Sequence, residues 1–144
     1  MTDTHPAQAR QAIQAGNILW GAARVALDRT LYERMLAPGF HVLLRGQRLA
    51  RDEFIERVAR DPPDLRLSRF EATVLTVQPS GADWVAMILE KLEYRRASTG
   101  TTDYILAITR DGWRQSVSGW QILFSELVGE ERWRDGEHPP MGDW

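Results

Sequence analysis

The sequence has no cysteine among its 144 residues, and its apolar runs are only a few residues long. Without cysteine the chain has no disulfides, no thiolate zinc ligands and no thiol nucleophile, which is typical of a protein of the reducing cytoplasm. Runs this short cannot span a bilayer. The first ten residues, MTDTHPAQAR, also lack the apolar core of a signal peptide, so we expect a cytoplasmic location and no membrane partner.

Residues that hold metals and cofactors are equally scarce. The three histidines, His5, His41 and His138, are far apart, and none lies in a histidine or carboxylate cluster with ligand spacing. The glycine-rich nucleotide-binding motifs and the G-x-S-x-G motif of serine hydrolases are also missing. We therefore expect no metal and no cofactor.

The chain has no basic excess, because its net charge is −2. Residues 24–69 carry ten arginines and seven acids, whereas residues 70–144 carry seven basic and twelve acidic residues. A nucleic-acid-binding domain is usually clearly basic, with aromatic residues among its cations. Here the arginines alternate with acids, which is typical of a solvated, ion-paired surface, so we expect no nucleic-acid partner.

The first sixty residues predict three helices. Apolar residues recur at spacings of three and four over residues 6–27, which indicates one long amphipathic helix. Asp28 and Thr30 are helix-capping residues that would start a second, short helix, and Pro38-Gly39 would end it. A third helix is predicted over residues 51–60, with acids at its start and arginines at its end as the helix dipole favours.

The remaining chain predicts strands separated by turns. Asp111-Gly112 is a hairpin signal, so residues 113–119 need a separate interpretation. We favour a last strand that begins at Trp113 and bends at Gly119, and the alternative is an inserted loop. The predicted strands are 40–44, 69–78, 84–95, 101–110 and 120–127.

These elements predict one α+β domain over residues 1–128, followed by a polar C-terminal tail over residues 129–144. Helices followed by a run of strands favour a sheet that is covered on one face. We expect three N-terminal helices packed on a strongly curved, mainly antiparallel sheet, which together form a cone with one open end.

Several segments match a known superfamily. They are Leu36-Ala-Pro-Gly-Phe40, Gly46, Glu53-Phe54, Gly81-Ala-Asp-Trp-Val-Ala86 and Gly119-Trp-Gln-Ile-Leu123. Over roughly residues 8–128, the sequence resembles the NTF2-like superfamily, whose cone-shaped barrel is shared with ketosteroid isomerase. Within it, the sequence is most similar to small bacterial SnoaL-like proteins of the DUF4440 type. The resemblance implies a homodimer, and it does not specify a function because this fold hosts many.

The resemblance to ketosteroid isomerase allows a test of its chemistry. Matching the two chains places the tyrosine donor of that enzyme at Trp20 and its aspartate base at Leu44. Neither Leu44 nor the adjacent Leu43 can abstract a proton, so we reject isomerase chemistry of that type. Limonene-epoxide-hydrolase chemistry would need two aspartates around an arginine. Asp103 and Arg24 are candidates, and no second aspartate is evident.

Period-two alternation identifies polar residues that could face the inside of the cone. If Trp84, Ala86 and Ile88 point inward, Glu90 and Tyr94 do so as well. Glu90 would then be a desolvated carboxylate with a raised pKa. Tyr94 would lie opposite Asp103 if the two strand positions add up to 197. The alternative, which we favour because a one-residue slip reverses every face, is that Glu90 pairs with an arginine at the rim.

The candidate ligand-binding residues combine these polar groups with large aromatic side chains. His41 and Trp20 are interpreted as structural first, with any ligand contact second. The full set is Trp20, Tyr32, His41, Phe54, Glu90, Tyr94, Asp103 and Trp120.

Three functions follow, and the first is the one we favour. The cone binds a small, largely apolar molecule without covalent chemistry, a hypothesis that a buried carboxylic acid beside a tyrosine in a closed pocket would overturn. Alternatively, the protein is a SnoaL-like cyclase, dehydratase or isomerase with Asp103 or Glu90 as acid/base. The last alternative is a dimerisation module whose cone is filled by its own side chains.

Overall fold

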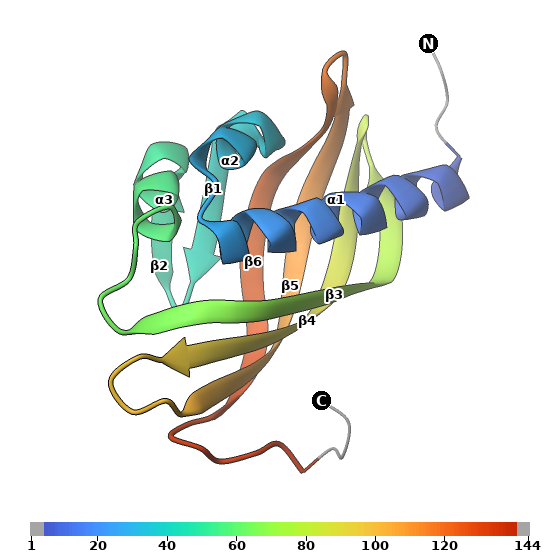
Figure 1. The fold of residues 1–144 in the computed structure, drawn as a ribbon. Helices are drawn as coiled ribbons and strands as arrows, with labels where there is room; N and C mark the ends of the chain where they lie inside the picture. Colours follow the sequence, from blue (N-terminus) through green and yellow to red (C-terminus); the bar gives the residue numbers. More distant parts are fainter. Residues whose placement is uncertain (1–4, 141–144) are drawn as a thin grey trace.

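The computed structural model describes residues 5–140, which form three helices and one six-stranded sheet (Figure 1). The helices come first in the chain, apart from a short hairpin, β1–β2, that precedes the last of them. The elements are α1 (Pro6–Ala26), α2 (Arg29–Met35), β1 (Leu36–Leu44), β2 (Gln47–Ala50), α3 (Arg51–Val58), β3 (Leu65–Ser80), β4 (Asp83–Arg96), β5 (Thr102–Ser116) and β6 (Gly119–Trp133).

The long helix α1 begins and ends where local chemistry dictates. The His5 side chain accepts a hydrogen bond from the Ala7 amide, and Pro6 occupies the first turn, where its missing N–H costs nothing. The helix ends at Leu27, whose backbone is left-handed with φ of 56°. Asp28 then caps α2 by accepting a hydrogen bond from the Leu31 amide at 3.2 Å.

The sheet has the strand order β2-β1-β6-β5-β4-β3. All neighbouring strands are antiparallel except β1 and β6, which run parallel. The sheet curves around the helices, and α1 lies across its concave side (Figure 1). The predicted fold class, three helices on a strongly curved and mainly antiparallel sheet, is confirmed.

The prediction for residues 111–119 was wrong in both of its versions. Asp111 and Gly112 lie within β5, which continues to Ser116, so Trp113 lies inside this strand and does not begin the next one. The true turn precedes Gly119, whose φ of 116° suits glycine, and the Ser116 hydroxyl donates to the Gly119 carbonyl oxygen at 2.7 Å. The fully buried Trp113 indole outweighs the local turn signal, because its burial removes a large apolar surface from water.

Several element boundaries also differ from the prediction, including those of β3, which was predicted over residues 69–78 and spans Leu65–Ser80. Strand β1 begins directly after α2, so Pro38-Gly39 lies inside a strand and does not separate helix from strand. Helix α3 ends at Val58. Strand β6 continues to Trp133, so residues 129–133 pair with β5. The first four and last four residues of the predicted domain and tail lie outside the described residues.

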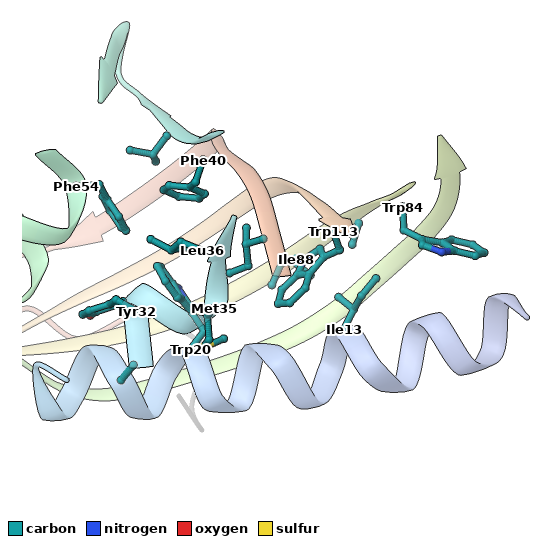
Figure 2. Close-up of a cluster of buried hydrophobic side chains, with 14 of the residues drawn as sticks. Ile13, Trp20, Tyr32, Met35, Leu36, Phe40, Phe54, Trp84, Ile88 and Trp113 are labelled. Atoms are coloured by element: carbon teal, nitrogen blue, oxygen red, sulfur yellow. The ribbon is translucent and has the colours of Figure 1, made fainter. Parts of the chain in front are cut away.

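The closed end of the cone is filled by side chains (Figure 2). Trp113 lies against Ile13, Ile88 and the glycine of α1 at position 16, and all of these belong to or border the main apolar core. A Cβ at Gly16 would lie 2.6 Å from the Trp113 ring, so only glycine permits this close approach. Within the described chain, no helix is both long and apolar enough to cross a membrane.

Candidate functional site

The open half of the cone contains a cavity of about 370 Å³. Its walls come from the end of α1, the end of α3, the β1–β2 turn and the inner face of β3 to β6. Its volume lies in the range of small-molecule sites, which is roughly 300–1,000 Å³. The long curved strands produce it, because they extend beyond the part of the cone that Trp113 fills.

The cavity changes from polar to apolar and back along its depth. Going outward along β4, the residues that point into the cavity are Glu90, Leu92 and Tyr94. The paired strand β5 extends along the same axis, from the deep end of the cavity to its mouth. The deepest part is polar, with Glu90, Thr109 and Ser125. Leu92 and other apolar side chains line the middle, and arginines line the mouth.

An aromatic pair forms one apolar wall. The rings of Trp20 and Phe54 stack with centroids 5.7 Å apart and planes inclined by 12°. Tyr32 packs edge-on against Trp20 from behind, at a centroid distance of 5.3 Å. The three rings bring α1, α2 and α3 together, and two of them, Trp20 and Phe54, line the cavity.

Glu90 is a buried carboxyl group without a direct partner. Only 7% of its surface is exposed, and no hydrogen bond or ion pair joins it to another residue of the described chain. Burial raises its pKa to about 7, the charge of Asp111 raises the pKa further, and the Arg24 guanidinium opposes both effects. Near neutral pH the group therefore exists in both protonation states, and it can donate or accept a proton.

Asp111 is a second buried acid at the closed side of the cavity. Its carboxylate accepts a hydrogen bond from the Ser125 hydroxyl at 2.7 Å, and 5% of the residue is exposed. Burial raises the pKa of this carboxyl to about 6, although the hydrogen bond from Ser125 opposes the shift. Sequence reasoning missed Asp111 because the Asp-Gly pair reads as a turn.

Arg24 was also missed as a partner of Tyr94. Its guanidinium donates a hydrogen bond to the Tyr94 phenol oxygen at 2.9 Å, and it lies 5.8 Å from the centre of the Phe70 ring. Because the phenol oxygen accepts from Arg24, the phenol O–H is free to donate to another group. The pair can therefore hold a carbonyl or hydroxyl oxygen of a bound molecule.

Four of the eight predicted ligand-binding residues line this cavity: Trp20, Phe54, Glu90 and Tyr94. The inward direction of Glu90 and the pairing of Tyr94 with Asp103 are confirmed. The favoured alternative, in which Glu90 pairs with an arginine at the rim, was wrong. Leu44 also lines the cavity, so an apolar side chain stands where the resemblance places the base of ketosteroid isomerase.

The other four residues are held elsewhere. Asp103 does not line the cavity; it accepts hydrogen bonds from Arg96 and from the Asp135 amide, both at 3.0 Å, in an adjoining depression that shares part of the cavity wall, Tyr94 included. Tyr32 is fully buried behind Trp20, and burial raises its pKa to about 12. His41 stacks on Phe124 on the other face of the sheet, with ring centroids 5.9 Å apart. Trp120 packs against the core, not around the cavity.

A buried carboxylic acid beside a tyrosine in a closed pocket would overturn the hypothesis of binding without covalent chemistry, and this condition is met in part. A buried carboxylic acid and a tyrosine do line one cavity of suitable size. They are not adjacent, because Leu92 stands between them on β4 and four residues of strand span about 13 Å. Arg24 is the group that interacts with both.

Comparison with known proteins identifies solved structures with the same fold. No family model matches the sequence, and no curated protein matches it. Solved structures do match. A conserved protein from Planctomyces limnophilus has a TM-score of 0.74 at 16% identity, over 83% of this chain and 96% of that one. An NTF2-like superfamily protein from Salmonella enterica has a TM-score of 0.68 at 14% identity, over 97% and 99%.

A ketosteroid isomerase-like protein from Erwinia carotovora matches as well. Its TM-score is 0.65 at 15% identity, over 85% of this chain and 98% of that one. Similarity at these identities concerns the backbone arrangement and not the site, because one fold carries many functions. The chain has the NTF2-like fold.

Proposed function

We propose that the protein binds a small, largely apolar molecule inside its cone. The observation that carries the proposal is the cavity of about 370 Å³, which is walled by the stacked Trp20 and Phe54 rings and by Leu92. A well-formed apolar pocket with a few convergent polar groups is the usual form of a small-molecule site. Glu90 at the deep end and the Arg24–Tyr94 pair nearer the mouth would fix the orientation of the molecule.

Titration with the uncharged fluorescent probe N-phenyl-1-naphthylamine tests this proposal. We expect one probe molecule per chain. Ala107 lies opposite Glu90 in the cavity wall, so Ala107→Phe should fill the space and abolish binding. Ala82→Phe is the matched control, because Ala82 is exposed in the turn between β3 and β4 and does not line the cavity. Equal binding by both variants, each shown to unfold cooperatively, would contradict the proposal.

Acid–base catalysis by Glu90 is the second candidate, in line with the chemistry of a cyclase, dehydratase or isomerase of SnoaL-like type. The observation that favours it is the partnerless buried carboxyl group with a pKa of about 7. A general acid or base works best when its pKa is near the operating pH. Asp103 is a poorer candidate than Glu90, since its carboxylate is committed to Arg96 and the Asp135 amide.

A loss of turnover distinguishes catalysis from binding. If Glu90 transfers a proton, Glu90→Gln should abolish any turnover while leaving affinity for the neutral probe within about twofold. Turnover by Glu90→Gln at the wild-type rate would remove this candidate. Asp103→Asn serves as the control, and it should retain activity.

We also propose a homodimer formed through the outer face of the sheet. The outward residues of β4 and β5 include Met87, Leu89, Leu106 and Ile108, which are apolar and half-buried. A contiguous apolar face of this kind is typical of protein–protein contacts. Sedimentation equilibrium should give twice the chain mass, and Leu89→Glu should give the single chain mass. A wild-type monomer at micromolar concentration would contradict the proposal.

A further inference from the structure

The mouth of the cavity carries an unusual number of positive charges. Five arginines and two glutamates are among the described residues that line the cavity. One of the glutamates is Glu90, which burial keeps partly protonated near neutral pH. The other, Glu130, lies at the mouth together with four of the arginines: Arg45, Arg57, Arg60 and Arg132.

Glu130 is already shared between two of these arginines. Arg45 donates two hydrogen bonds to its carboxylate, at 2.7 and 2.8 Å, and Arg132 approaches the same two oxygens at 3.2 and 3.4 Å. One negative charge therefore faces two positive ones, and the group of three retains a net positive charge. Arg45 lies in the β1–β2 turn, where its own backbone is left-handed, with φ of 47°.

The other two arginines form no ion pair within the part of the chain that the structure describes. Arg57 lies in the last turn of α3 and Arg60 lies just beyond it, and both are exposed. Neither forms an ion pair or a hydrogen bond with any residue of the described chain, although most surface arginines of this protein are paired. Their side chains are thus available at the cavity entrance to an anion from outside.

We propose that the ligand of this cavity is an organic anion, with an apolar body and a carboxylate or similar acid group at one end. The apolar body lies between the Trp20–Phe54 wall and Leu92, and the acid group lies at the mouth against Arg57 and Arg60. Arginine binds carboxylate oxygens with paired, charge-assisted hydrogen bonds, which makes it well suited to this role. The inference rests on the proposed function and adds the chemical class of the ligand.

Two probes that differ by one charged group test the inference. N-phenyl-1-naphthylamine and 8-anilino-1-naphthalenesulfonate share their ring system, and only the second carries an anionic sulfonate. We expect the wild-type protein to bind the sulfonate about five- to tenfold more tightly, the range expected from two exposed ion pairs. The preference should shrink as salt concentration rises, because salt screens exposed charges.

Matched double variants distinguish the effect of the arginines at the mouth from the effect of the protein's overall charge. Arg57→Gln/Arg60→Gln should remove the preference for the sulfonate and leave binding of the neutral probe within about twofold. Arg34→Gln/Arg48→Gln removes the same charge from exposed arginines outside the cavity, so it should keep the preference. A hexanoate or benzoate competitor should displace the sulfonate from the wild-type protein.

The outcomes distinguish the inference from the proposed function. Equal affinity for the two probes, or equal loss of the preference in both double variants, would overturn the organic-anion inference while leaving small-molecule binding in place. Binding of neither probe would overturn the proposed function, and the inference with it.

Discussion

Replacing Glu90 with glutamine should stabilise the protein at neutral pH and above, while changing its stability little at acid pH. In the unfolded chain this carboxyl has its ordinary pKa of 4.5, whereas in the folded protein burial and the charge of Asp111 raise the pKa to about 7. Between these two pH values the folded protein binds more protons than the unfolded chain. The free energy of unfolding therefore falls as the pH rises through this range.

The size of the effect follows from the shift. This rise in the pKa of Glu90 corresponds to a loss of about 3 kcal/mol in the free energy of unfolding between about pH 4.5 and pH 7. Glutamine is uncharged throughout, so the variant lacks this loss. Because the substitution also removes the favourable interaction of the Glu90 charge with Arg24, we expect the variant to gain about 2 kcal/mol over the wild type near pH 8.

Urea unfolding followed by tryptophan fluorescence, at pH values of about 4, 6 and 8, measures the difference. Glu131→Gln is the matched control, because it makes the same substitution at an exposed position on β6. Wild-type and Glu90→Gln stabilities that stay parallel over this pH range would mean that Glu90 has an ordinary pKa in the folded protein. A variant that is less stable than the wild type at pH 8 would contradict the expected gain.

Three further predictions concern neighbouring parts of the structure. Asp111→Asn should lower the pKa of Glu90 below its wild-type value, since the Asp111 charge raises it; a carboxyl-carbon NMR titration measures the change. Gly16→Ala should destabilise the protein by about 1–2 kcal/mol in urea unfolding, because the new Cβ would lie 2.6 Å from the Trp113 ring. Asp103→Asn should cost about 2 kcal/mol of stability and leave probe binding unchanged, because it weakens two hydrogen bonds outside the cavity.

Each of these has a clear contrary result. An unchanged Glu90 pKa in Asp111→Asn would mean that the two acids do not interact. Gly39→Ala is the control for the glycine variant, because a Cβ there meets nothing within 4 Å, and equal stabilities of the two variants would contradict the packing argument. Loss of probe binding in a folded Asp103→Asn protein would mean that Asp103 contributes to the binding site.

The sequence carries enough information for the fold because its helices and strands have strong periodicity. The spacing of Ala9, Ile13 and Trp20 identifies the buried face of α1, and the alternation from Trp84 to Leu92 identifies the inner face of β4. The pairing of Tyr94 with Asp103 followed from the position of one turn. These are local properties, so one sequence suffices to predict them.

The composition of the cavity depends on the three-dimensional course of the strands. Asp103 and Tyr94 are paired neighbours, yet the Arg96 and Asp135 contacts hold Asp103 outside the cavity. Arg24 enters the site because α1 crosses the sheet, and Asp111 comes close to Glu90 from behind the cavity wall because β5 passes through an apparent turn signal. Packing between distant segments decides such placements, and the periodicity of a single helix or strand does not reveal that packing.

We propose that the cone holds a small molecule in the cavity between the Trp20–Phe54 wall and β4. A crystal structure of the protein with saturating N-phenyl-1-naphthylamine tests it most directly. We expect one ordered probe per chain, with its rings against Trp20 and Leu92 and within reach of Glu90. A cavity closed by the protein's own side chains, with the probe absent or bound only on the outer face of the sheet, would contradict it.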